Sequence, residues 1–198
     1  MTDVNPLNYI EGEARLWVGA FGVTEPNQTL SALEADPGAG WTFLGATQGG
    51  VSWEDDQTVT GARADQVIDE IGGRVTARKT MVTFSLMEGT LANLAVGLNG
   101  FGSVSSPAEG VSVYDPGQMT AGDIPAYSAI LVDGWAPQVS GGGKARRRGI
   151  FRKLLNTGAK VGQQYDPTKQ SLIPVSFQCY YVGPNLSPYV ILDQTATS

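Results

Sequence analysis

The sequence predicts a mainly β protein, a β-sandwich or barrel with one flanking α-helix at about residues 90–98 and a long projecting loop or hairpin. Three observations predict it. Apolar and polar residues alternate over many short runs, 26 glycines and 11 prolines separate those runs, and one segment alone has convincing helical spacing. The length of 198 residues suits one domain with its own core, so we expect a single domain over residues 1–198.

The first part of the chain contains three runs with strand character, which we expect at 14–21, 41–45 and 51–53. Residues 1–12 carry no periodic pattern and are predicted to form an N-terminal arm. The proline- and glycine-bearing segment 26–40 connects the first two strands, with one helical turn around Leu30 and Leu33.

Residues 74–87 form the most unusual run, a predicted strand of about 45 Å where the usual length is about five or six residues. Val75 and Ala77 lie on its odd face, whereas the later apolar residues Val82, Phe84 and Leu86 lie on its even face. Such a phase change indicates a bulge, or a strand whose two halves bury against different partners. Because 54–73 lacks clean periodicity, we expect about 54–79 to be a projecting arm that contacts another subunit.

The predicted helix begins after Thr90, whose hydroxyl can cap it. Its apolar residues follow the i, i+3, i+4, i+7 spacing of one buried face: Leu91, Leu94, Ala95 and Leu98. Asn99-Gly100 supplies the stop signal. One helix packed on a sheet is therefore expected.

The remaining chain is again strand-dominated. Residues 101–125 are rich in loops, with one short strand at 111–114. Further strands are expected at 127–132, 147–155, 173–181 and 189–193, and residues 193–198 are predicted to be a C-terminal tail.

The absence of histidine and the presence of one cysteine exclude whole classes of chemistry, namely Ser-His-Asp triads, Cys-His pairs and histidine metal sites. Cys179 alternates with polar residues on a strand, which is typical of a buried, inert thiol. The run Gly141–Lys144 lacks the spacing and the following Ser or Thr of a phosphate loop. We expect neither enzymatic activity nor a cofactor.

No targeting or membrane signal is visible. The N-terminus has no basic region followed by an apolar run, and no apolar stretch approaches the roughly 20 residues of a membrane span. We therefore expect synthesis in a cytoplasm and no membrane anchoring.

Acidic residues gather in the predicted arm: Glu54, Asp55, Asp56, Asp65, Asp69 and Glu70. They could hold a divalent cation or include a glycosidase carboxylate pair, but no EF-hand spacing is present. Solvated or ion-paired carboxylates are the favoured interpretation.

Six of the 13 basic residues crowd one short segment: Lys144, Arg146, Arg147, Arg148, Arg152 and Lys153. Three interpretations stay open. The segment could bind nucleic acid, although Phe151 is its one aromatic neighbour for stacking; it could be a charged strand edge; or it could meet the acidic residues of a neighbouring subunit. The candidate interface residues are then this basic segment together with Glu54, Asp55, Asp56, Arg74, Arg78 and Lys79.

The order of these elements resembles that of a known family. A strand leads into Phe43–Val51, an acidic arm follows, and Val75–Glu88 runs into the helix at Thr90–Leu94; a basic strand around Arg147, Leu172–Phe177 and Tyr189–Gln194 complete the pattern. Over residues 14–194 the chain resembles the major tail tube protein of bacteriophages with long non-contractile tails, of the siphovirus type. Residues 99–125 have no counterpart in the pattern.

The resemblance implies a tail tube fold, a β-sandwich-like subunit of which six copies form a ring, while rings stack into the tube that conducts DNA into the host. The location would be the tail of the virion. The partners would be further copies of the chain, a tape measure protein, and tail terminator and distal tail proteins at the tube ends. DNA would pass through the lumen without sequence-specific binding, because a net charge of −6 per subunit repels phosphates.

Two other classes remain possible at this point. A tube protein of a related contractile-injection or secretion system would share the ring, whereas a capsid decoration or carbohydrate-binding β-sandwich would not polymerise. If the chain forms a tube, we expect the basic segment to lie at contacts between subunits. Replacing Arg147 and Arg148 by Glu should then block assembly while the monomers stay folded.

Overall fold

The structure is a computed structural model, and it describes residues 12–26, 36–63, 65, 68–100, 102–118, 120–139, 143–158 and 160–194, without the side chains of 137–139 and 143–144. Three predicted features lie almost wholly outside the described residues: the N-terminal arm at 1–12, the helical turn around Leu30 and Leu33, and the C-terminal tail at 193–198.

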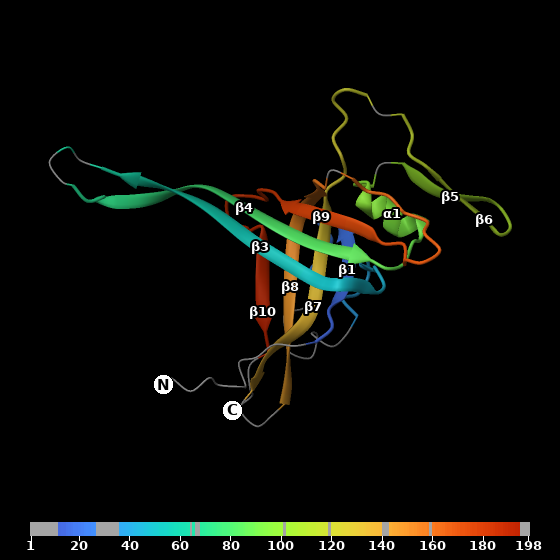
Figure 1. The fold of residues 1–198 in the computed structure, drawn as a ribbon, viewed down its shortest axis with the longest axis horizontal. Helices are drawn as coiled ribbons and strands as arrows, with labels where there is room; N and C mark the ends of the chain where they lie inside the picture. The colour runs from blue at the N-terminus through green and yellow to red at the C-terminus, as the bar shows by residue number, and fades with distance from the viewer. Residues whose placement is uncertain are drawn as a thin grey trace.

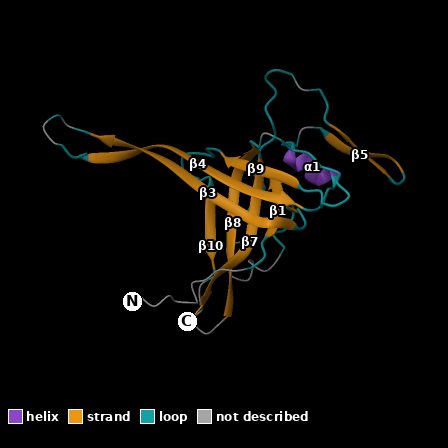
Figure 2. Cartoon of the chain, viewed as in Figure 1, coloured by secondary structure: helices purple, strands orange, loops and turns teal. Residues whose placement is uncertain are grey.

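The described residues form ten strands and one short helix, which confirms the mainly β prediction (Figure 2). In chain order the elements are β1 (Arg15–Ala20), β2 (Thr42–Phe43), β3 (Thr47–Ala62), β4 (Gly72–Leu86), α1 (Leu91–Gly97), β5 (Ser103–Ala108), β6 (Val111–Asp115), β7 (Ser128–Val139), β8 (Gly143–Asn156), β9 (Ile173–Cys179) and β10 (Tyr189–Asp193).

Eight strands belong to one antiparallel sheet of order β2-β1-β7-β8-β9-β4-β3, with β10 paired to β8 beside β9. The sheet folds over on itself. In Figure 1, β3, β4 and β9 run across β1, β7, β8 and β10, so that the two groups of strands form crossed layers. The corner lies at the end of β8, where Leu154–Asn156 pairs with Phe177–Cys179.

The main core lies between these layers. Its fully buried members come from both: Leu16, Leu44, Val82, Phe84, Leu86, Ile130, Phe151, Leu154, Ile173, Val175 and Phe177. Phe84 and Phe177 stack with ring centroids 5.9 Å apart, which joins β4 to β9 across the pair. The alternating pattern of β9 in the sequence correctly identified the core residues of that strand.

A second apolar cluster lies on the other face of β1, β7 and β8. It contains Trp17, Trp41, Ala129, Leu131 and Ile150. Trp41 precedes β2, and its indole N–H donates to the Thr24 carbonyl at 3.0 Å. This face of the sheet is therefore covered by the chain's own connecting segments.

The helix has the predicted ends. The Thr90 hydroxyl accepts a hydrogen bond from the Asn93 amide at 3.1 Å, and Asn99 follows the helix with a left-handed φ of 59°. The buried face differs from the prediction, because the leucines are half-buried while Asn93 and Gly97 are the buried residues. The side-chain amide of Asn93 donates to the carbonyls of Leu44 and Glu88, and these hydrogen bonds hold α1 beside β2.

Residues 103–115 contain a hairpin of which the sequence analysis found only the second strand. β5 and β6 form a separate two-stranded sheet close to α1, away from the main layers (Figure 1). The sequence Ser-Val-Ser-Ser-Pro-Ala holds one large apolar residue, so β5 gave no alternation to detect.

Candidate assembly interface

β3 and β4 form a long two-stranded ribbon that projects from the body of the molecule (Figure 1). The two strands stay paired from Thr47↔Leu86 out to Ala62↔Gly72. The first eight residues of β4, 72–79, lie toward the tip and are all exposed. From Thr80 to Leu86 every second residue is buried, and the residues between them are half-buried or exposed. We call residues 56–79 the outer ribbon; at about 3.3 Å per residue it reaches roughly 25 Å beyond the core.

β4 contains a β-bulge, as the phase change indicates, but the bulge precedes Ala77 instead of following it. Thr58 pairs with Ala77 and Val59 with Val75, so Thr76 is the extra residue, and Ala77 lies on the opposite face from Val75. The bulge moves Val75 to the same face as Val82 and Phe84. The core-facing side of the ribbon therefore continues outward beyond the body, and the long predicted strand is confirmed.

This continued face of the outer ribbon carries three uncovered apolar residues beyond Gln57 and Arg78. Val59, Ile71 and Val75 share it and are 61%, 62% and 52% exposed. An isolated two-stranded ribbon is marginal in water, and clustered exposed β-branched residues mark a contact surface. The outer ribbon thus has the composition of a surface that another molecule covers.

The ribbon also has a free edge, since among the described strands β3 pairs with β4 alone. Gly49 and Gly50, both with φ of 79°, form a bulge that interrupts pairing at the inner end of β3. From Val51 to Ala62 the edge carries neither lysine nor proline, and its charged residues are confined to Glu54–Asp56, which leaves Gln57–Ala62 without the residues that commonly block edge-to-edge pairing. A strand of another copy could pair along this edge.

The ribbon root is a polar cluster centred on Asp55. One carboxylate oxygen accepts hydrogen bonds from the Thr80 hydroxyl at 2.9 Å and Arg78 Nε at 3.0 Å, and the other accepts from the Tyr189 hydroxyl at 2.8 Å. The Tyr189 ring lies between Trp53 and Phe151, at centroid distances of 5.8 and 5.7 Å. Because Tyr189 belongs to β10, this cluster ties the ribbon to the other layer.

The ionisation of Asp55 gives a pH prediction. Burial alone would raise the pKa of Asp55, but the hydrogen bonds from Tyr189 and Thr80 and the charge of Arg78 outweigh it and bring the pKa below its ordinary value. A carboxylate with a lowered folded pKa contributes stability that is complete above the unfolded pKa of about 3.9 and is lost as pH falls through the folded value.

The stability difference between wild type and Asp55→Asn should therefore be constant from about pH 5 to pH 9 and shrink below about pH 4. At the alkaline end, burial and the bond to Asp55 raise the pKa of Tyr189, and burial raises the pKa of the nearby Cys179 to about 12, so both stay neutral. Urea unfolding of both proteins across this range would test the expectation; a difference that disappears between pH 6 and 8 would contradict it.

The other acidic residues of the arm are solvated or ion-paired, as favoured from the sequence. Glu70 pairs with Arg63 at 3.1 Å near the tip, and Asp56 lies directly opposite Lys79 on the ribbon. Glu54 and Arg74 are exposed on the ribbon surface. In the part of the chain that the structure describes, no three acidic or thiol side chains converge as a metal site would require.

The basic segment lies on β8, which is an internal strand with β7 on one side and β10 and β9 on the other. The interpretation of this segment as a charged strand edge is therefore wrong. Arg148 is fully buried and donates two hydrogen bonds to Asp133 on β7, both at 2.6 Å. A buried, bidentate pair of this kind is part of the protein interior.

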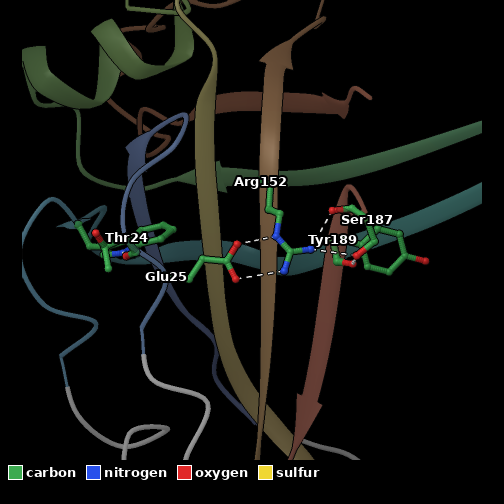
Figure 3. A network of polar contacts seen from close by, with 6 residues as sticks. Thr24, Glu25, Arg152, Ser187 and Tyr189 are labelled. Carbon is green, nitrogen blue, oxygen red and sulfur yellow. Dashed lines mark hydrogen bonds and ion pairs between the residues drawn. The ribbon is translucent and has the colours of Figure 1, made fainter. Parts of the chain in front are cut away.

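Arg152 is likewise held inside the chain (Figure 3). Its guanidinium lies between two segments, donating to both carboxylate oxygens of Glu25 at 2.5 and 3.1 Å and to the carbonyl and hydroxyl of Ser187 at 2.8 and 2.9 Å. It thereby joins the segment after β1 to the start of β10.

The remaining basic side chains have neighbours in the same chain too. Arg147 makes a bidentate contact with Asp193 at 2.6 and 2.7 Å, which lowers the pKa of Asp193. Arg146 lies 4.1 Å from the Trp135 ring centroid, and Lys153 lies 4.5 Å from that of Tyr127. The side chain of Lys144 lies outside the described residues.

The expectation that the basic segment meets acidic residues of a neighbouring subunit is wrong for Arg147, Arg148 and Arg152. Each of these arginines pairs with an acidic residue of its own subunit. The uncovered surface lies on the ribbon instead. Replacing both Arg147 and Arg148 by Glu would unfold the monomer, because Arg148 is buried against the carboxylate of Asp133. An intersubunit role stays a prediction for the other candidates: Glu54, Asp55, Asp56, Arg74, Arg78, Lys79, Lys144, Arg146 and Lys153.

Tyr189 and Thr80 are not among the residues that the sequence predicts for this cluster. Both are ordinary strand residues by pattern, and Tyr189 is separated from Asp55 by 134 positions. Only the crossing of β10 beneath the ribbon root brings them together.

Comparisons with known proteins add little to this geometry. No family model matches the chain, and no curated protein matches it. A solved structure titled "Crystal structure of Hcp protein" aligns with 84% of this chain and 88% of its own, at 14% identity and a TM-score of 0.32. That TM-score is too low to indicate a common fold, so function has to be argued from the ribbon and its edge. Within the described residues, no helix is long and apolar enough to cross a membrane.

Proposed function

We propose that this chain is the self-assembling structural subunit of a tube, with six copies per ring and rings stacked end to end. The outer ribbon supports this most, because its core-facing side continues beyond the described body of the chain, where no described residue covers its apolar side chains. Val59, Ile71 and Val75 become buried when the ribbon lies on a neighbouring copy.

The free edge of β3 supports the same assembly. Its unpaired N–H and C=O groups from Val51 outward can continue the sheet into a neighbour, as strand addition does in many complexes. Lateral pairing along the inner part of this edge, residues 51–55, would close copies into a ring, while the outer ribbon would reach across to the next ring.

The function we propose for the tube is that of a bacteriophage tail, conducting DNA through its lumen. The pattern of elements over residues 14–194 supports the tail, and the net charge supports the lumen. Six subunits of charge −6 give 6 × (−6) = −36 per ring, which disfavours adhesion of phosphates to the channel.

Electron microscopy of the concentrated, purified protein tests the proposal. We expect rings with sixfold symmetry that stack into tubes, in equilibrium with free subunits on dilution. Particles that stay monomeric at millimolar concentration would contradict it, and trimers without stacking would point to a decoration protein.

A further inference from the structure

The ribbon root stands at the point where β3 and β4 leave the body. Thr80 is the last buried residue of β4 on the way out, and Asp55 is half-buried beside it, whereas residues 72–79 are exposed. Among the described residues, the side-chain hydrogen bonds of the outer ribbon stay within the ribbon, as between Thr60 and Thr76 or Arg63 and Glu70. The direction of the ribbon is therefore set at its root.

Tyr189 supplies the contact from the body. Its hydroxyl donates to Asp55 at 2.8 Å, its ring packs against Trp53 of β3, and the Arg78 guanidinium lies 5.1 Å from its ring centroid. One side chain of β10 thus touches three residues of the ribbon, two on β3 and one on β4. Such contacts fix the angle of a two-stranded ribbon that could otherwise bend or twist about its base.

We propose that Asp55 and Tyr189 are positioning residues for assembly, which hold the ribbon at the angle required for docking on a second copy. This inference rests on the proposed self-assembly. A ribbon oriented before docking loses less conformational freedom on binding, so assembly begins at a lower protein concentration. Neither residue needs to touch the neighbouring copy to have this effect.

Tyr189→Phe and Asp55→Asn separate this role from folding. The phenylalanine keeps the ring between Trp53 and Phe151 and removes only the hydroxyl, while the asparagine keeps the shape of Asp55 and removes its charge. Because hydrogen bonds to a charged group are among the stronger ones, we expect the critical concentration for assembly to rise about tenfold. If Tyr189→Phe fails to fold, Asp55→Asn provides the same test.

Two control variants match these changes. Glu109→Gln removes the same charge from an exposed turn between β5 and β6, outside the ribbon, and Tyr181→Phe removes a hydroxyl from an exposed residue. We expect both controls to assemble as wild type does. A rise in critical concentration with Glu109→Gln equal to that with Asp55→Asn would overturn the proposal, since the loss of one negative charge alone would then explain the effect.

Amide hydrogen exchange of dilute, unassembled subunits provides a readout that does not depend on tubes. We expect faster exchange at Trp53–Gln57 and Arg78–Val82 in both root variants, with unchanged exchange in β7 and β8. The Asp55→Asn, Tyr189→Phe double variant should exchange no faster than Asp55→Asn alone, because Tyr189→Phe removes only a bond that Asp55→Asn already weakens. Unchanged exchange, or faster exchange with unchanged assembly, would overturn the positioning role, whereas failure of wild type to assemble would overturn the proposed function itself.

Discussion

Removal of the outer ribbon should abolish tube formation and leave the body of the protein folded. The variant joins Gln57 to Arg78 through a two-residue Asn-Gly turn, which suits a tight hairpin. The main core contains no residue of the excised segment 58–77, so thermal unfolding should remain cooperative. Electron microscopy should then show single subunits or isolated rings at concentrations where wild type forms tubes.

A gentler variant tests the same surface with the ribbon intact. Val59→Thr with Val75→Thr keeps two β-branched residues in the strands but makes the apolar face polar. Each buried valine contributes about 1.5 kcal/mol, and every 1.4 kcal/mol is about tenfold in affinity, so the critical concentration should rise at least about tenfold. Thr58→Ser with Thr60→Ser on the opposite face is the matched control. If the control and the valine variant assembled equally well, the apolar face would have no role.

Replacement of Arg148 by Glu should cost more stability than any change on the ribbon. Arg148 is fully buried and bidentate to Asp133, and breaking such a pair typically costs about 3–5 kcal/mol, because a charge is left unpaired in the interior. Arg147→Glu is the neighbouring control. Its pair with Asp193 is about one-third exposed and should be worth about 1 kcal/mol or less.

Urea unfolding at neutral pH measures both changes. We expect Arg148→Glu to be largely unfolded without urea, or to have a far lower midpoint, and Arg147→Glu to unfold close to wild type. Arg148→Met combined with Asp133→Leu should recover much of the loss, since apolar residues of similar volume often replace a buried ion pair well. Wild-type stability in Arg148→Glu would show that the pair is not buried in solution.

The elements that the sequence predicted correctly are those governed by local pattern. The alternation of β9 identified its buried residues, Thr90 and Asn99 marked the ends of α1, and the phase change in β4 indicated a bulge, although the bulge lies at Thr76 and not beyond Ala77. In each case neighbouring residues carry the signal, because strand faces and helix caps depend on spacings of a few positions.

The predictions that failed depended on contacts between distant residues. The arginines of β8 looked like a charged surface segment, yet Arg152 finds Glu25 at a separation of 127 positions and Arg148 finds Asp133 across a strand pair. Whether an arginine is solvated or buried against a carboxylate depends on which strands become neighbours. Likewise, nothing near Asp55 in the sequence identifies Tyr189 as its partner.

Site-specific photocrosslinking can show whether the outer ribbon contacts another copy of the chain. A photoreactive residue at Val75, with the same residue at exposed Lys160 as control, would be activated in concentrated mixtures of isotope-labelled and unlabelled protein. We predict that position 75 yields crosslinked peptides joining labelled to unlabelled chains in high yield, and that position 160 yields few. Crosslinks from position 75 that stay within one chain, or the same low yield at both positions, would show that the ribbon does not dock on a second copy.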